Sequence, residues 1–166
     1  MKKLQVEKIS EYFPLDKRKD QEGKRKKKEN EKFEEDKDRV IEKYNELGFR
    51  DAYIYADSVV DVGENLVDVY LHIDEGEKYY VRSINWVGNT VYQTDILNRL
   101  LQMKRGDIYN RVHLEKRLRD IMDPNSINTL YYNNGYVFNQ IEDVEKDVVE
   151  DSVDLEIRIY EGTQAT

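Results

Sequence analysis

The sequence predicts an α+β chain of two tandem β-α-α-β-β units, and two internal matches support this fold class. Residues 67–76 return as residues 153–162, and in both copies every second position is apolar. Such alternation is typical of a strand with one face on a core and the other in water. Residues 44–49 likewise return as residues 131–136, an aromatic-rich helix end that is closed by glycine. Because the matches keep their order and nearly their spacing, a duplicated domain is the leading interpretation.

Composition bounds the size of the units and the classes of protein. With 166 residues the chain allows two units of roughly 80 residues, each with a thin core of two layers. The net charge is −8 at pH 7 and both halves are acidic, which argues against general nucleic-acid binding. Cysteine is absent, so disulfides, thiol catalysis and cysteine–zinc sites are excluded.

The first unit is predicted to span residues 1–78 and begins with a charged region. Residues 1–14 fit either a helix end or a short strand, and the basic loop 16–32 predicts a solvated connection. An alternative interpretation is that the basic run 17–28 contacts lipid phosphates or an acidic partner. The residues that would make this anionic contact are Lys24, Arg25, Lys26, Lys27 and Lys28. The acidic residues that follow would weaken their field within about one Debye length.

The rest of the first unit predicts one helix and a hairpin. Apolar residues at helical spacing favour a helix over residues 33–47. Residues 52–56 and 67–74 then predict an antiparallel hairpin. A leading strand is not visible before the helix, so we expect the sequence to begin inside the first repeat.

The second unit, residues 79–166, shows the whole element order. A strand over residues 79–87 precedes a helix that Thr94 is expected to cap. A second helix begins near residue 110 and is interrupted by Pro124, after which Ser126 can cap a resumed helix. A strand over residues 137–144 then pairs with the alternating strand 153–160.

This order, together with four short motifs, resembles the POTRA domain, and more narrowly the tandem POTRA domains of BamA-like outer-membrane β-barrel assembly factors. The motifs are Ile84-x-x-Val87-Gly88-Asn89-Thr90, Gly106-Asp107-Ile108-Tyr109, Tyr131-x-x-x-Gly135-Tyr136 and the terminal pair Glu161-Gly162. The resemblance implies, for each unit, a three-stranded mixed sheet with two helices on one face. An insert near residues 123–126 and the basic run in the first unit depart from the family pattern.

The resemblance also implies a function and a place. POTRA arrays of this family lie in the periplasm, attached to the outer membrane of a Gram-negative bacterium by a C-terminal membrane barrel. There they receive unfolded outer-membrane proteins and dock accessory lipoproteins beside adjacent POTRA domains. The expected partners are therefore these proteins and not nucleic acid. Alternatives are the POTRA region of another secretion or cell-division protein, or an anionic-surface binder that uses residues 17–28.

The expected mode of binding is addition of a client strand to a free sheet edge, which offers unpaired backbone groups. By resemblance the edge is the strand after the glycine–aromatic pair in each unit. The tyrosines of the first segment could instead cover the hairpin, and the acids after the second could guard its edge against aggregation. The candidate edge residues are Ala52, Tyr53, Ile54, Tyr55, Ala56, Val137, Phe138, Asn139, Gln140 and Ile141.

Residues that could carry chemistry do not form a catalytic or metal-binding pattern. The two histidines, His72 and His113, stand apart from other ligand-type residues at coordinating spacing, and a structural role is expected for both. Glycines are scattered singly rather than in a phosphate-binding loop. We therefore expect a non-enzymatic protein without cofactors.

Overall fold

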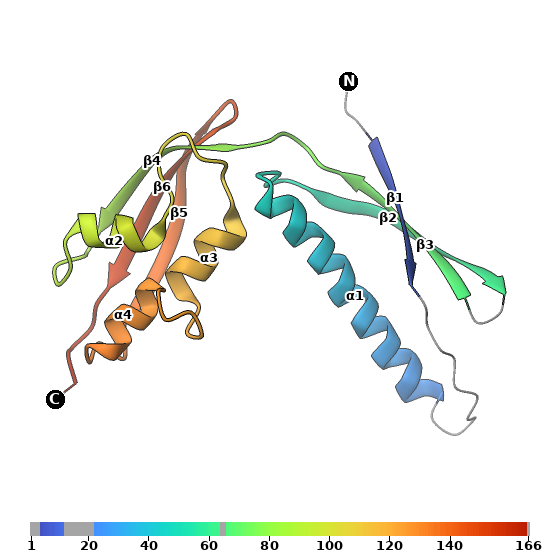
Figure 1. Cartoon of the computed structure of the whole chain (residues 1–166), viewed down its shortest axis with the longest axis horizontal. Helices are drawn as coiled ribbons and strands as arrows, with labels where there is room; N and C mark the ends of the chain where they lie inside the picture. The colour runs from blue at the N-terminus through green and yellow to red at the C-terminus, as the bar shows by residue number, and fades with distance from the viewer. Residues whose placement is uncertain (1–3, 12–21, 64–65, 166) are drawn as a thin grey trace. The chain divides into compact units, whose positions relative to one another are not determined.

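A computed structural model describes residues 4–11, 22–63 and 66–165, which form two compact units. The first unit comprises Met1–Tyr44 and Asp51–Gly76, and the second comprises Asn45–Arg50 and Glu77–Thr166. Each unit contains a three-stranded sheet with helical cover (Figure 1). The segment Asn45–Arg50 thus belongs to the second unit, although its first two residues are the last two of the long helix Glu22–Glu46.

The first unit is an antiparallel sheet with one long helix. Its elements are β1 (Leu4–Glu11), α1 (Glu22–Glu46), β2 (Tyr53–Gly63) and β3 (Leu66–Asp74), and the strand order is β1-β3-β2. The central strand buries Val69, Leu71 and Ile73, as the alternating pattern predicted. On the same side, Lys37 of α1 reaches Asp57 of β2, with 3.0 Å between Nζ and Oδ2. This ion pair ties the helix to the sheet.

Three expectations for the first unit are wrong in the part that the structure describes. The leading strand that was not visible in the sequence is present as β1, at one edge of the sheet. The sheet is not mixed, because β1 runs antiparallel to β3, and α1 is the one helix between these strands. Residues 22–32 of the expected loop are helical instead. Lysine, arginine and glutamate are good helix formers, and pairs such as Lys37–Glu34, at 2.8 Å, join successive turns of α1. Residues 12–21, which include the start of the basic run, lie outside the described residues.

The second unit has the predicted mixed sheet with helices on one face. Its elements are β4 (Tyr80–Val87), α2 (Thr94–Leu101), α3 (Arg111–Arg119), α4 (Ile127–Asn133), β5 (Gln140–Val149) and β6 (Ser152–Tyr160). The strand order is β4-β6-β5, with β4 parallel and β5 antiparallel to the central β6. The alternating residues of β6 pack against buried residues of all three helices, and the core residues are Val81, Trp86, Leu97, Leu101, Met103, Tyr109, Leu114, Leu118, Ile127, Tyr131, Ile141, Val153, Leu155, Ile157 and Ile159.

Of the two helix caps that the sequence predicted, one is present and the other is not. Ser126 caps α4 as predicted, since its hydroxyl accepts a hydrogen bond from the Thr129 N–H at 3.1 Å. Thr94 does not cap α2: it is the first helical residue, and Gln93 occupies the capping position without a side-chain bond. The Thr94 hydroxyl instead accepts from the Asn89 amide at 3.3 Å. That bond ties the helix to the turn after β4.

Candidate functional site

The outer edge of β2 is the first candidate site. This strand is 11 residues long, about twice the usual length, and lies at the edge of the described sheet. Its C-terminal half carries Val59, Val60 and Val62, whose side chains are 54%, 48% and 53% exposed. Long exposed edges with apolar side chains readily pair with another strand. The arrangement is therefore suited to the addition of a peptide strand.

Two tyrosines lie on β2 beside this edge. Tyr53 and Tyr55 are about half exposed, and their ring centroids are 6.5 Å apart with the rings tilted by 64°. The ring centroids of Tyr55 and of His72 on β3 lie 5.8 Å apart, at a bulge where the pairing of the two strands shifts. His72 thus contacts an aromatic ring of the neighbouring strand. The rings form a semi-rigid apolar surface with wet polar ends.

The predicted first edge segment is placed largely as expected. Four of its five residues, Tyr53 to Ala56, lie in β2, while Ala52 precedes the strand and is buried. Sequence reasoning ended this strand too early, since β2 continues to Gly63 and pairs with β3 as far as Leu66. Asp61 and Gly63 are residues of types that favour turns, but a bulge between them accommodates the change within the ladder.

The predicted second edge segment is only partly correct. β5 begins at Gln140, so Val137, Phe138 and Asn139 precede the strand. Asn139 ends a tight turn, in which its backbone N–H and its side-chain amide both donate to the Tyr136 carbonyl, at 3.3 and 2.8 Å. This local hydrogen bonding competes with strand pairing. Gln140 and Ile141 alone of that segment lie in β5.

The acidic residues after Ile141 lie within β5 and are held by side chains of the same unit. Arg119 of α3 donates to the Ile141 carbonyl at 3.0 Å and to the Asp143 carboxylate at 2.6 Å. Its hydrogen bonds to Glu115 and Asp143 raise the pKa of the guanidinium further above its ordinary value. The start of the β5 edge is thus already occupied by a cation.

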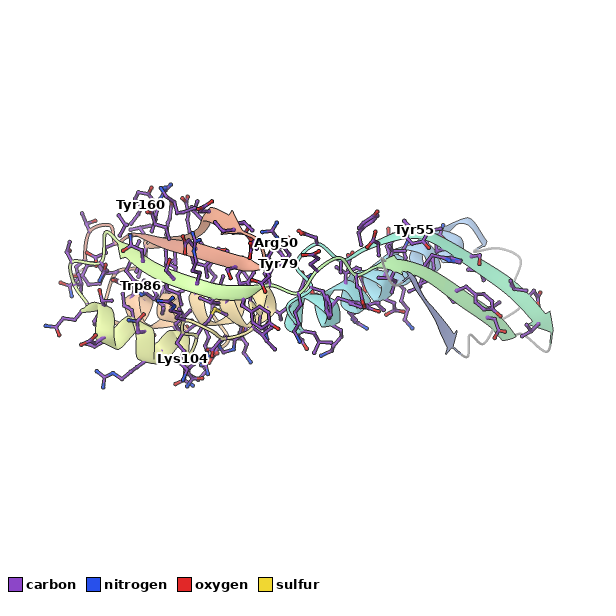
Figure 2. The ribbon with its side chains drawn as sticks, turned by 90° about the horizontal axis from the view of Figure 1, so that it is seen from above. Arg50, Tyr55, Tyr79, Trp86, Lys104 and Tyr160 are labelled. Atoms are coloured by element: carbon purple, nitrogen blue, oxygen red, sulfur yellow. The ribbon has the colours of Figure 1, made fainter. Side chains whose placement is uncertain are left out.

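The middle of β5 is held through Glu145. Its carboxylate accepts from the Tyr109 hydroxyl at 2.9 Å and from Arg50 at 2.8 Å. Burial, and then the neighbouring Glu145 charge, raise the pKa of Tyr109 above its ordinary value. Arg50 also stacks on Tyr79, with 4.4 Å from the guanidinium carbon to the ring centroid (Figure 2). β5 therefore offers a less open edge than β2.

A junction at Glu161 joins three of the motifs that carry the family resemblance. Its carboxylate accepts from the Thr90 hydroxyl, from the N–H groups of Thr90 and Val91 at 2.8 and 2.9 Å, and from the Tyr131 hydroxyl at 2.8 Å. Burial alone would raise the pKa of this carboxyl, but these hydrogen bonds outweigh it and lower the pKa. Sequence reasoning treated the Glu-Gly pair as a strand end and missed this junction, although the repeated motif was a signal for it.

The remaining sequence candidates have no site geometry in the described residues. The backbone of Lys24 to Lys28 lies in α1, but their side chains are outside the described part. His113 Nε2 lies 2.8 Å from the Leu101 carbonyl, a structural contact between α3 and α2. A cluster of three or more metal-ligating side chains is not found among the residues that are described. In the same residues, every helix is too short or too polar to cross a membrane.

Comparisons with known proteins agree on one family. The sequence pattern of the family described as POTRA, surface antigen variable number repeat, matches residues 79–162. The chain is 31% identical over 135 residues to a Treponema pallidum (strain Nichols) protein named as an outer membrane protein assembly factor. The aligned region covers 78% of this chain and 15% of that relative. It is 28% identical over 109 residues to the outer membrane protein assembly factor BamA of Neisseria meningitidis serogroup B. This aligned region covers 63% of this chain and 14% of that relative.

Solved structures show the same fold. The crystal structure of Haemophilus influenzae BamA POTRA3-5 matches with a TM-score of 0.60 and 23% identity, and covers 80% of this chain and 51% of that one. BamA from Haemophilus ducreyi lacking POTRA domains 1-3 matches with a TM-score of 0.53 and 17% identity, and covers 74% of this chain and 21% of that one. The chain therefore has the fold of these POTRA arrays, and it spans about 15% of the length of its curated relatives.

Proposed function

The chain belongs to the POTRA family, and we propose that it serves as a periplasmic, non-catalytic scaffold that binds other proteins during outer-membrane barrel assembly. Its relatives are outer membrane protein assembly factors by name, which supports this place and process. In the whole protein, adjacent POTRA domains and a C-terminal barrel in the outer membrane of a Gram-negative bacterium would flank the fragment. Its partners would be unfolded outer-membrane proteins and accessory lipoproteins.

The observation that carries the proposal is the outer edge of β2. An unfolded outer-membrane protein exposes strands of about 9–11 residues with alternating side chains. The 11 residues of β2 match such a strand in length, and an added strand would satisfy the backbone groups along its outer edge. Main-chain hydrogen bonds require no particular client sequence, which suits a scaffold that receives many clients.

Side chains near the β2 edge support the same mode. Tyr53 and Tyr55 would cover apolar side chains on one face of an added strand, and Val59 would pack on its opposite face. β5 is the weaker candidate, because Arg119 already binds the carbonyl of Ile141 and four acids line the strand. We therefore assign client capture to β2 first.

The test is a titration of the isotope-labelled chain with a strand peptide from an outer-membrane barrel protein, followed by amide chemical shifts. A peptide of about ten residues matches a membrane strand, and the control is the same peptide with prolines that prevent pairing. Shifts concentrated on Tyr53–Gly63 with the first peptide alone are the expected result. Shifts confined to residues 17–28 would favour the anionic-surface alternative, and a β2 strand unaffected at millimolar peptide would refute capture at this edge.

A further inference from the structure

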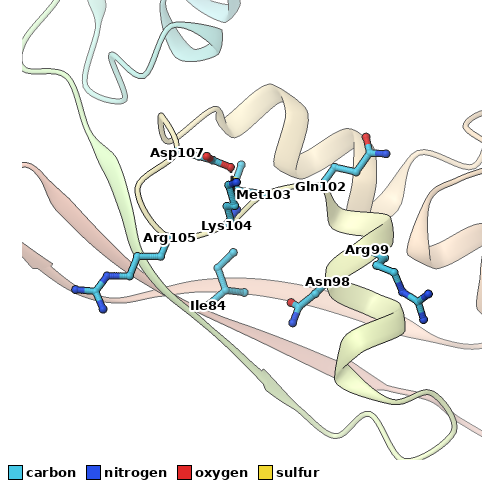
Figure 3. Close-up of a pocket in the computed structure, with 8 residues that line it drawn as sticks. All are labelled: Ile84, Asn98, Arg99, Gln102, Met103, Lys104, Arg105 and Asp107. Carbon is cyan, nitrogen blue, oxygen red and sulfur yellow. Dashed lines mark hydrogen bonds between the residues drawn. The ribbon is translucent and has the colours of Figure 1, made fainter.

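A groove in the second unit lies between β4 and α2, at the edge of the sheet opposite β5. Ile84 of β4 and Met103 form its apolar floor, and the groove encloses about 610 Å³ (Figure 3). Its other lining residues come from α2 and the loop that follows it: Asn98, Arg99, Gln102, Lys104, Arg105 and Asp107. An apolar floor with polar groups around it is the usual composition of a binding groove.

The outer edge of β4 is paired at one end and open at the other. Its first residues bond the loop after α2, where the Val81 N–H donates to the Asp107 carbonyl at 2.9 Å and the Gly106 N–H donates to the Val81 carbonyl at 2.8 Å. Past this point, the described residues contain no strand beside residues 83–87, because β4 is the edge of its sheet. The loop therefore begins a strand-like pairing that another segment could continue.

The polar groups around the groove are mainly hydrogen-bond donors and cations. Asn98 uses its carbonyl oxygen to accept from Trp86 Nε1 at 2.8 Å, which leaves its amide N–H groups as donors. Gln102 likewise uses its oxygen to accept from Arg117. The carboxylate of Asp107 accepts from the Lys104 N–H at 2.9 Å and stabilises the loop.

The groove is lined by three cationic side chains and by one carboxylate, that of Asp107, so the charge of its lining is net positive. Arg99, Lys104 and Arg105 have no ion-pair partner within the described part of the chain, whereas the cations of β5 and its neighbours are paired. This is a local exception in a chain of net charge −8. Charge complementarity therefore favours an acidic occupant over a neutral or basic one.

From these observations we propose that the groove binds an extended peptide segment of a partner protein in which acidic and apolar side chains alternate. The segment runs along the open part of β4, its backbone continues the pairing that Val81 begins, and its apolar side chains cover Ile84 and Met103. Its carboxylates face Arg99, Lys104 and Arg105. This site is separate from the proposed capture of barrel strands at β2 and does not depend on it.

The test uses the whole chain, isotope-labelled, and a peptide of about eight residues that alternates glutamate and valine. A matched peptide with lysine in place of glutamate is the control. We expect amide shifts at Ile84, Asn98 and Met103 with the glutamate peptide alone. The double variant Lys104→Glu, Arg105→Glu is expected to bind about tenfold more weakly, whereas Arg111→Glu, Lys116→Glu, a charge reversal on exposed α3 residues, leaves affinity within about twofold.

Peptide chemistry tests the backbone pairing without altering the protein. N-methylation of alternate peptide residues removes every second donor, so one methylated series is expected to lose binding and the series offset by one residue to keep it. Equal binding of the glutamate and lysine peptides, shifts outside the groove, or shifts at the groove with anionic lipid vesicles but not with the peptide would each overturn the proposal. Shifts at β2 in the barrel-strand titration report separately on the proposed function.

Discussion

The hydroxyl of the buried Tyr131 donates a 2.8 Å hydrogen bond to the carboxylate of Glu161. Tyr131 lies on α4 and Glu161 directly follows β6, so this bond fastens a helix to the end of the central strand. The same carboxylate also binds the Thr90 turn that follows β4. Three motifs that are distant in the sequence thus meet at one acidic side chain, which gives a physical reason for their joint occurrence.

Replacing Glu161 by alanine should destabilise the second unit. The change removes the partner of the buried Tyr131 hydroxyl and of two backbone N–H groups, and we expect a loss of roughly 2 kcal/mol in the free energy of unfolding. Urea unfolding followed by the fluorescence of Trp86, the single tryptophan, measures this unit directly. Glu142→Ala on exposed β5 is the control, and a Glu161→Ala effect no larger than that of the control would contradict the junction's role.

The second unit should also lose stability in acid through Glu161 and Asp154. Hydrogen bonds from Arg82 and Ser83 lower the pKa of Asp154 to about 2, and the pKa of Glu161 is lowered as well. A carboxyl whose pKa is lower in the folded state contributes stability above its unfolded pKa, about 4.3 for glutamate and 3.9 for aspartate. That contribution is lost as the pH falls through the folded pKa, for Asp154 down to about pH 2.

Urea unfolding at several pH values checks this dependence. Glu161→Gln is expected to be less stable than the unmodified chain at pH 7 and to approach it at low pH, because the variant has no carboxylate to protonate. Asp154→Asn should show the same convergence as the pH falls to about 2. Parallel curves for variant and unmodified chain across the acid range would show that these carboxyls do not carry the effect.

Glycine is required at position 88 and not merely preferred. Gly88 has φ of +86°, and a Cβ there would lie 2.2 Å from the Ile159 carbonyl oxygen of the neighbouring strand. We expect Gly88→Ala to cost roughly 3 kcal/mol or more in unfolding free energy, since both the backbone conformation and the packing are affected.

Gly106 is a matched control for this substitution. Its φ is +88°, but a Cβ there meets no atom within 4 Å. Gly106→Ala should therefore cost only the conformational part, about 1–2 kcal/mol. Thermal and urea unfolding of the two variants would separate the contributions, and equal losses would show that the contact with Ile159 relaxes without cost.

The β2 tyrosines should affect client binding more than stability. Tyr53 and Tyr55 are about half exposed, so the double change to serine is expected to alter unfolding free energy by less than about 1 kcal/mol. The affinity for a barrel-strand peptide should fall several-fold, as stacking area beside the edge is lost. Fluorescence anisotropy of a labelled peptide measures this, with Tyr132→Ser on α4 as an equally exposed control. A similar loss in the control would mean that the peptide binds tyrosine non-specifically.

Several elements of the first unit illustrate why local patterns mislead. Residues 22–32 have little apolar periodicity, yet their helix propensity extends α1 well before residue 33. Strand direction also has no local signature, because side chains alternate in the same way in parallel and antiparallel strands. The antiparallel pairing of β1 therefore could not be predicted from the residues of that strand.

The sequence by itself determined the α+β class, the element order of the second unit and the buried face of each central strand. These features follow from periodicity and from glycine and proline positions, which act within a few residues of the chain. The tertiary structure alone decided which strand edges stay open and which are occupied. Arg119 meets the β5 edge, and Arg99, Lys104 and Arg105 surround the β4 groove, through packing between elements. Contacts of this kind join residues that are far apart in sequence, and no short-range pattern records them.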